Sequence, residues 1–274
     1  MRRPLWMFVV GSVAAACLAV ASSASAAPVV RKSGCFFTSI QAAINAAQSG
    51  ATITIGVGTY EENIVVNKPV TLRGAGVGTV IYPATSNPVC SGGSLCGRSA
   101  SNIILVEAND VTIKSLQLKG DNPNLTSGVV VGGEDLDARN GIITNHLAGT
   151  FNNLTVEKVK VTGVYLRGMY ASSGGTFNFN HNIVDKVQAE EASVAMFDFE
   201  GAGVMSFNKV TNANDTISAN WSKGTQFLRN QVSKSGSGVH TDNNGGSGGS
   251  ADLLRENTVH ECKVNEYGVW VFVP

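Results

Sequence analysis

The apolar positions of this chain follow a helical period once, near the start, and a period of two thereafter. Over residues 40–47 they recur at helical spacing, where Thr38 or Ser39 can cap the helix and Gly50 can stop it. Short β runs separated by Gly, Asn, Pro or Asp are then expected at 52–55, 64–66, 70–72, 102–105, 111–113 and 115–118. These runs are too short to be free strands of an ordinary sandwich.

A repeat appears in the second half of the chain. Asn precedes an apolar run at Asn182, Asn208, Asn230 and Asn257, at intervals of 22 to 27 residues. A period in the twenties indicates one supersecondary unit per repeat, stacked on its neighbours to bury a continuous core. Leucine-rich repeats share this period, but their leucine consensus is absent and no helix recurs, so the pattern favours a parallel β-helix. Asn tolerates a left-handed backbone, and its amide can bond to the Asn one coil away, so we expect a structural ladder.

Both ends of the chain carry information. Arg2 and Arg3, an apolar run over 5–20 and the small residues 24–26 predict a signal peptide over 1–26 and a secreted, extracellular or periplasmic protein. Residues 27–274 are expected to form a single domain without an integral membrane segment. The sequence stops on an apolar strand before Pro274 with nothing to cover the last coil. We therefore expect a truncated chain, or an open coil that pairs with further sequence or another subunit.

Composition narrows the partners. Lys plus Arg and Asp plus Glu both number 20, so no overall field favours nucleic acid or an anionic membrane. Cys90 and Cys96 span a short Ser/Gly loop that a disulfide can close, whereas Cys35 and Cys262 lie at opposite ends of a solenoid and are expected to be buried or free thiols. The Cys and His residues show no metal-ligand spacing, and no metal site is predicted.

The opening of the mature chain has a recognisable form. It reads Ser-Ile-Gln-Ala-Ala-Ile at 39–44, Gly-Thr-Tyr-Glu-Glu-Asn-Ile at 58–64 and Val-Thr-Leu-Arg-Gly-Ala-Gly at 70–76. This stretch resembles the opening of the pectin-lyase-like right-handed parallel β-helix superfamily, including pectinesterases. The resemblance implies an all-β, right-handed parallel β-helix solenoid with a short N-terminal capping helix. It does not fix a function, because the same opening serves esterases, lyases, hydrolases, epimerases and binding solenoids.

The catalytic segments of these families are missing. Of the pectinesterase segments, only Asp-Phe-Ile-Phe-Gly has a faint counterpart, Phe-Asp-Phe-Glu-Gly at 197–201. The Asp-Asp and Gly-His-Gly segments of polygalacturonases and the Arg-x-Pro-x-x-Arg segment of pectate lyases are absent. No family's catalytic residues are therefore carried over, and Tyr60 and Glu62 are assigned to turn packing.

Aligning the coils on their Asn corners also aligns the strands upstream, at 168–172, 195–199, 216–220, 238–242 and 268–272. The second position is apolar in each, so it points inward, and the third and fifth positions point outward. The third positions are Tyr170, Phe197, Ser218, His240 and Trp270, and the fifth positions are Ser172, Phe199, Asn220, Asp242 and Phe272. Aromatic, amide and carboxylate groups in rows suit sugar binding, with Tyr170, Phe197, Asn220 and Trp270 as candidate contacts. Alternatively, a loop near 84–101 or 243–250 covers the stripe and makes a second core.

Two acidic clusters are candidates for acid–base chemistry. This register turns Asp198 and Glu200 inward, unless they lie at a strand end or the coil is shifted by one residue. In the shifted register the two carboxylates become neighbours that can act as acid and base or hold calcium, so a calcium cofactor is possible. Otherwise they are solvated turn residues or a buried, hydrogen-bonded Asp. His240 and Asp242 share a strand face, where the imidazole can act as a general base.

The charged residues nearby complete the prediction. Arg167 and Lys223 lie within about one coil of these clusters and can neutralise an acidic sugar, or are simply solvated. We therefore expect a polysaccharide or oligosaccharide ligand and a polysaccharide lyase or glycoside hydrolase with Asp198, Glu200, His240 and Asp242 as acids and bases. The alternative is a non-catalytic, adhesin-like or carbohydrate-binding solenoid.

Overall fold

The computed structural model describes residues 28–31, 37–242, 251–263 and 270–271, with the backbone alone at 242, 270 and 271. The predicted signal peptide, the last residues 272–274, the loop over 243–250 and Cys35 lie outside these described residues.

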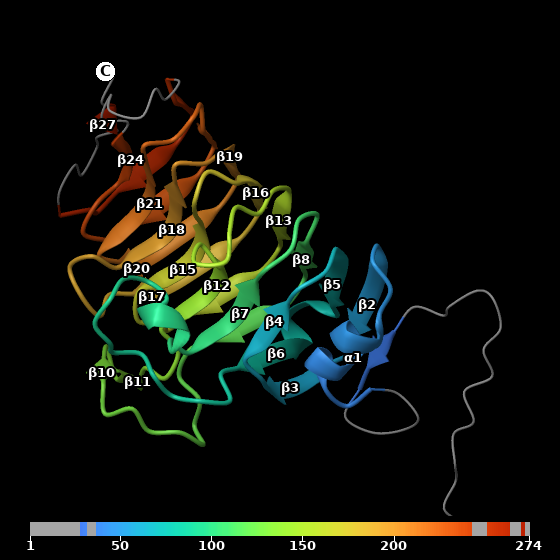
Figure 1. Cartoon of the computed structure of the whole chain (residues 1–274). Coiled ribbons are helices and arrows are strands. Elements are labelled where there is room, and N and C mark those ends of the chain that lie inside the picture. Colours follow the sequence, from blue (N-terminus) through green and yellow to red (C-terminus); the bar gives the residue numbers. More distant parts are fainter. Residues whose placement is uncertain (1–27, 32–36, 243–250, 264–269, 272–274) are drawn as a thin grey trace, which may run out of the picture.

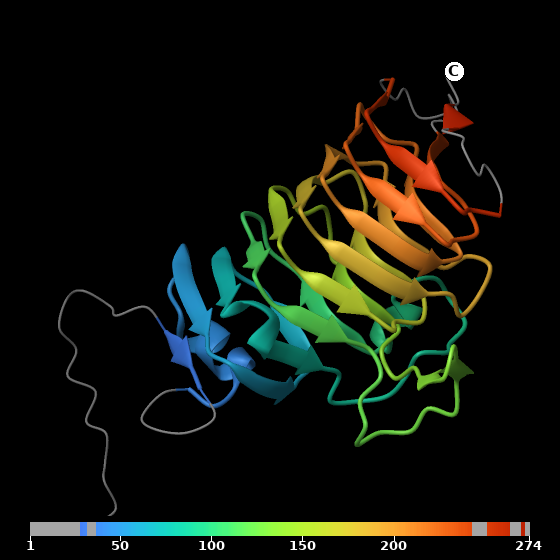
Figure 2. The same cartoon turned by 180° about the vertical axis from the view of Figure 1, so that it is seen from behind.

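Three parallel sheets wind around one axis (Figure 1; Figure 2). Sheet A comprises β1 (Val29–Val30), β2 (Ala51–Ile55), β5 (Val70–Gly74), β8 (Thr112–Lys114), β13 (Leu154–Glu157), β16 (Thr176–Asn180), β19 (Ala202–Ser206), β22 (Gln226–Leu228) and β25 (Leu253–Arg255). Sheet B comprises β3 (Gly58–Glu61), β6 (Thr79–Tyr82), β9 (Gln117–Lys119), β14 (Lys160–Thr162), β17 (Ile183–Val187), β20 (Lys209–Ala213), β23 (Gln231–Ser233) and β26 (Thr258–His260). Sheet C comprises β4 (Ile64–Val66), β7 (Asn102–Val106), β12 (Asn140–Thr144), β15 (Arg167–Ala171), β18 (Val194–Phe199), β21 (Asp215–Asn220), β24 (Val239–Asp242) and β27 (Trp270–Val271).

The chain visits sheets A, B and C in turn, so each circuit adds one strand to every sheet. This order defines a parallel β-helix, the solenoid fold that the sequence predicts. Side chains that point inward form continuous columns. One column in sheet A consists of buried residues in register, Ile53, Leu72, Ile113, Val156, Phe179, Met205 and Phe227. Burying each side chain contributes about 1.5–3 kcal/mol, so stacking rather than any single strand stabilises the coils.

The predicted capping helix is present as α1 (Ile40–Ala46). The Ser39 hydroxyl accepts a hydrogen bond from the Ala42 amide, and the Glu62 carboxylate accepts bonds from the Ile40 and Gln41 amides. These acceptors satisfy amides that have no partner in the first turn of a helix. Glu62 therefore has a structural role, as expected, and α1 buries Ile40 against the first coils.

The asparagine ladder is also present. The backbone N–H of Asn182 donates a hydrogen bond to Oδ1 of Asn208. The equivalent bond links Asn208 to Asn230 and Asn230 to Asn257. The explanation from backbone conformation was wrong, because the left-handed residue is the one before each Asn. These residues have φ between 54° and 58°: His181, Phe207, Arg229 and Glu256. The Asn amide is needed instead to bond the backbone across the corner, as Asn208 Nδ2 does to the Phe179 carbonyl.

Two excursions leave the coils between strands of sheets B and C. The first is the loop over 83–101, which contains η2 (Cys96–Arg98) and the disulfide Cys90–Cys96. The second carries the antiparallel hairpin of β10 (Val130–Val131) and β11 (Glu134–Asp135). A further short helix, η1 (Gly76–Gly78), lies between β5 and β6. Within the described residues, no helix has the length and apolarity needed to cross a membrane.

Candidate functional site

The outer face of sheet C carries the predicted row of side chains. Strand pairing places Tyr170 beside Phe197, Phe197 beside Ser218, Ser218 beside His240 and His240 beside Trp270. The inward positions are as expected, since Met169, Met196, Ile217 and Val239 are fully buried. The predicted register is therefore confirmed, although the side chain of Trp270 is not among those described.

The first two aromatic residues of the row are covered. Tyr170 and Phe197 stack with ring centroids 4.9 Å apart, and only 6% and 7% of their surfaces are exposed. Leu95 from the loop over 83–101 packs on them together with Ile143 and Val194, forming a second hydrophobic cluster outside the solenoid. Their assignment as exposed sugar contacts was wrong; the alternative of a covered second core holds at these two positions. A buried ring face cannot stack on a sugar.

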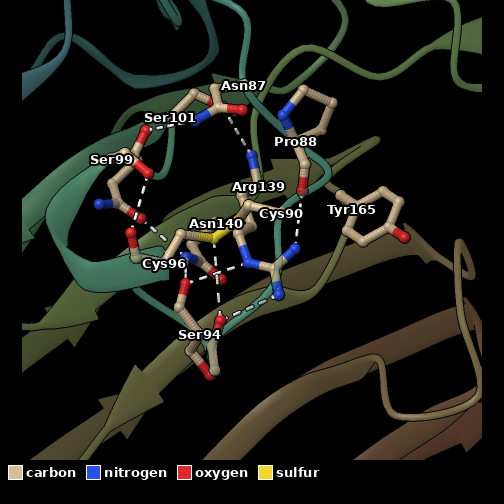
Figure 3. Close-up of a disulfide and its surroundings, with 12 residues drawn as sticks. Asn87, Pro88, Cys90, Ser94, Cys96, Ser99, Ser101, Arg139, Asn140 and Tyr165 are labelled. Atoms are coloured by element: carbon tan, nitrogen blue, oxygen red, sulfur yellow. Dashed lines mark hydrogen bonds between the residues drawn. A yellow bond between two sulfur atoms is a disulfide. The ribbon is translucent and has the colours of Figure 1, made fainter.

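A buried arginine makes several hydrogen bonds to this loop (Figure 3). Arg139 is buried, and its guanidinium donates to the carbonyl oxygens of Ser94, Pro88 and Gly93 at 2.7 to 3.2 Å. Burial lowers the pKa of Arg139. The predicted disulfide between Cys90 and Cys96 lies in the same loop. The guanidinium of Arg139 thus attaches the loop to the start of β12, and the disulfide closes the loop on itself.

Arg167 belongs to this covered region. Its guanidinium carbon lies 5.0 Å from the Phe197 ring centroid and 5.6 Å from that of Tyr170, and it donates to the Ser94 hydroxyl and the Ala192 carbonyl. Burial lowers the pKa of Arg167, while nearby Tyr170 and Asp215 act in the opposite direction. Arg167 therefore packs on the aromatic pair and stands at the edge of the uncovered part of the sheet.

Asp198 points into the solenoid and is fully buried. Its carboxylate accepts hydrogen bonds from the Thr225 hydroxyl at 2.7 Å and the Gly201 amide at 3.0 Å. Burial raises the pKa of Asp198 to about 7 despite these bonds. The catalytic role assigned to Asp198 was wrong, because a carboxyl group with no exposed surface cannot touch a polymer. The buried, hydrogen-bonded reading is the one that the structure bears out.

Glu200 does not join Asp198 on one face. It is half-buried in the turn after β18, where its backbone is left-handed with φ of 60°. A pair of adjacent carboxylates, as the shifted register required, is therefore not formed. Among the described residues, no cluster of three or more His, Cys, Asp or Glu side chains is placed to hold a metal ion.

His240 has an acidic partner that sequence reasoning missed. Its Nε2 lies 2.8 Å from Oδ1 of Asp215, at the start of the neighbouring strand β21, and Ser237 also donates to that oxygen. Both side chains retain between a fifth and a quarter of their exposure. Asp242, the predicted partner, has only its backbone described, so its role stays a prediction.

An aromatic pair, one ring half-buried and one exposed, lies at the other end of these strands. Phe199 and Trp221 have ring centroids 5.1 Å apart, and Trp221 is 40% exposed. Asn220 is half-buried beside them, with its Oδ1 accepting from the Ser218 hydroxyl, and Lys223 is exposed just beyond. Predicted contacts Asn220 and Lys223 therefore adjoin accessible aromatic surface.

We call the outer surface of β21 and β24, together with the end of β18, the terminal face. Its partly exposed side chains are Phe199, Asp215, Asn220 and His240, with Trp221 at the rim and the buried Ser218 between them. Neighbouring strands are about 4.8 Å apart and alternate residues about 6.6 Å apart, so the acid–base pair and the aromatic rim lie within the length of a few sugar rings.

Comparison with known proteins gives a likeness of fold. No protein-family model matches the chain, and no curated protein matches it. The chain is similar to the solved pectin methylesterase from Aspergillus niger, with 13% identity over 92% of each chain and a TM-score of 0.49. It is also similar to pectin methylesterase from carrot, with 12% identity over 93% of this chain and 90% of that one and a TM-score of 0.48. A pectin methylesterase in complex with a hexasaccharide gives 17% identity over 76% and 79%, with a TM-score of 0.44. At such distances the function must be argued from this chain's own residues.

Proposed function

We propose that this chain is a secreted protein that acts on an extracellular polysaccharide at the terminal face of sheet C, with His240 as the general base. The observation that carries the proposal is the 2.8 Å contact between His240 Nε2 and Asp215 Oδ1 on a partly exposed surface. A carboxylate at one ring nitrogen fixes the orientation of the imidazole and increases its basicity, which suits a general base.

The groups present favour elimination over hydrolysis. Glycoside hydrolysis uses two carboxyl groups roughly 5–10 Å apart on either side of the bond, and Asp198 is withdrawn into the core. Elimination from a uronate needs one base and a cation near the sugar carboxylate. His240 removes the proton on the carbon next to that carboxylate, the electron pair forms a carbon–carbon double bond, and the glycosidic oxygen leaves and takes up a proton. Lys223 is the exposed cation at one end of this face, where the sugar carboxylate would lie, whereas Arg167 lies at the covered edge with its guanidinium hydrogen-bonded to Ser94 and Ala192.

A second candidate is binding without catalysis. The exposed ring of Trp221, packed on the half-buried Phe199, favours it, because aromatic surface beside amide and ammonium groups is sufficient to hold a sugar. In that case His240 serves as a hydrogen-bonding contact only.

The experiment is an activity screen with matched variants. Protein lacking residues 1–26 is incubated with plant, algal and bacterial polysaccharides, with and without calcium, while unsaturated products are followed by ultraviolet absorbance and cleavage by new reducing ends. We expect both signals to rise together, and His240→Ala to lower the rate by about 100-fold or more, the usual contribution of a general base. His260→Ala, which removes an exposed histidine paired with Glu261 on another corner, should leave the rate unchanged.

Each other outcome has a meaning. Reducing ends without unsaturated products would replace elimination with hydrolysis. Folded protein that cleaves nothing but still binds a polysaccharide through Trp221 would support the binding function instead.

A further inference from the structure

A band of positive charge follows the corner between sheets A and B, away from the outer face of sheet C. We call it the basic ridge and define it by seven cations and two carboxylates at the end of the sheet A strands, the corner itself and the start of the sheet B strands: Arg73, Lys114, Lys158, Lys160, Lys209, Arg229 and Arg255, with Glu157 and Glu256. The whole chain carries 20 basic and 20 acidic residues, so this surplus is a local segregation of charge.

Strand pairing makes the ridge continuous. Arg73 pairs with Lys114 on neighbouring strands, and Lys160 and Lys209 lie in one row on either side of Ile183. The two carboxylates are already engaged, Glu157 by Lys158 at 3.1 Å and Glu256 by both Arg229 and Arg255. Four of the cations have no ion-pair partner among the described residues: Arg73, Lys114, Lys160 and Lys209.

Two hollows lie along the ridge. One of about 330 Å³ is lined by Lys158, Lys160 and Ile183, and one of about 300 Å³ by Phe207, Arg229 and Leu253 with their neighbours. His181 and Phe207, which stack at 4.8 Å, belong one to each hollow and join them. The apolar side chains Ile183, Phe207 and Leu253 are between 43% and 47% exposed. Cations therefore alternate with apolar surface along the ridge.

We infer that the basic ridge binds an extended acidic polysaccharide, a polyuronate, lying lengthwise along the solenoid. Coils repeat about every 4.8 Å, so the seven sheet A strands from β5 to β25 span about 29 Å. An extended oligomer of about six uronate residues has a similar length, so successive carboxylates can meet successive coils. The exposed apolar side chains offer contacts to the C–H faces of the sugars.

The same surface suits nucleic acid less well. Single strands gain affinity by stacking bases on aromatic rings, and the only aromatic ring here besides His181 is Phe207, in the described part of the ridge. This ring is already in contact with two side chains, the His181 ring with its centroid at 4.8 Å and the Arg229 guanidinium at 5.5 Å from the centroid of Phe207. The basic ridge therefore suits an acidic polysaccharide better, because sugar rings do not need aromatic rings on which to stack.

The test measures binding of polygalacturonate oligomers long enough to cross seven coils, by titration calorimetry at several salt concentrations. The ridge variant is Lys114→Gln/Lys160→Gln/Lys209→Gln, and the charge-matched control is Lys119→Gln/Lys234→Gln/Lys263→Gln, at positions outside the ridge. We expect the ridge variant to bind on the order of 30-fold more weakly with a shallower salt dependence, because it lacks three exposed charge contacts, and the control to bind like the parent. The fully methyl-esterified oligomer, which has no charge, should not bind measurably at the ridge.

Several results would overturn the inference: no binding by the parent protein, equal weakening in both variants, equal affinity for the esterified oligomer, or equal or tighter affinity for single-stranded DNA. All proteins carry His240→Ala, so turnover is removed, and circular dichroism verifies that each variant is folded. The inference goes beyond the proposed function and does not rest on it. Absence of cleavage by the parent would refute the acid–base role of His240 while leaving the ridge binding result unaffected.

Discussion

Replacing Asp198 by Asn should change how the stability of the protein depends on pH. The native pKa of Asp198 is about 7, against a value of 3.8 for the ordinary carboxyl group. Below about pH 3.8 the group is protonated in the folded and unfolded chain alike. Between these values the folded chain keeps a proton that the unfolded chain has lost, so stability falls as pH rises and the loss is complete above about pH 7. A difference of about 3 pKa units at 1.36 kcal/mol each gives about 4 kcal/mol.

The assay is urea unfolding, followed by circular dichroism from pH 4 to pH 8, for the parent and Asp198→Asn. Other ionisable groups contribute equally to both, so the difference between the two proteins isolates Asp198. The variant should gain about 4 kcal/mol relative to the parent between pH 4 and pH 8, because its amide keeps an acceptor for the Gly201 amide and carries no charge to bury. A difference that is constant with pH would show that Asp198 is ionised in the core at all these values and would refute the reasoning. Thr225→Val, which removes a hydroxyl donor to the carboxylate, should steepen the dependence.

Three further substitutions test the packing. Leu95→Ala should lower the free energy of unfolding of the loop over 83–101 by about 2–4 kcal/mol, because it empties the centre of the second hydrophobic cluster; hydrogen exchange of the loop amides checks this, and unchanged protection would contradict it. Asn208→Ala should cost about 2–3 kcal/mol in thermal unfolding, since the amide of Asn182 loses its acceptor inside the core; an unchanged melting temperature would show that the ladder is not stabilising. Gly168→Ala should cost about 1–3 kcal/mol, because the added Cβ would lie 2.4 Å from the Ala195 carbonyl oxygen, and a variant as stable as the parent in urea would show that the coils spread at no cost.

The fold was predictable because the solenoid repeats its local pattern. Alternation within single coils was enough to align Tyr170, Phe197, Ser218 and His240, and strand pairing places them together as expected. The same alternation turned Asp198 inward, and the structure keeps it there.

The partners between coils could not be predicted in the same way. Asp215 lies 25 residues before His240, and Thr225 lies 27 residues after Asp198. Because the number of residues per coil varies, no local sequence motif predicts which residues of neighbouring coils lie side by side. Arg139 lies 51 residues from Pro88, and nothing in the sequence of either segment indicates that one holds the other. The sequence therefore left undecided whether a loop covers the aromatic row, and only the structure shows that the loop over 83–101 does so.

The acid–base role of the terminal face is tested most directly by a crystal structure of the His240→Ala protein with an intact uronate oligosaccharide. We predict that the sugar lies over Asn220 beside Trp221, with the carbon next to its carboxylate facing the space that the imidazole would fill. An oligosaccharide bound elsewhere while this face stays empty would contradict the proposed function.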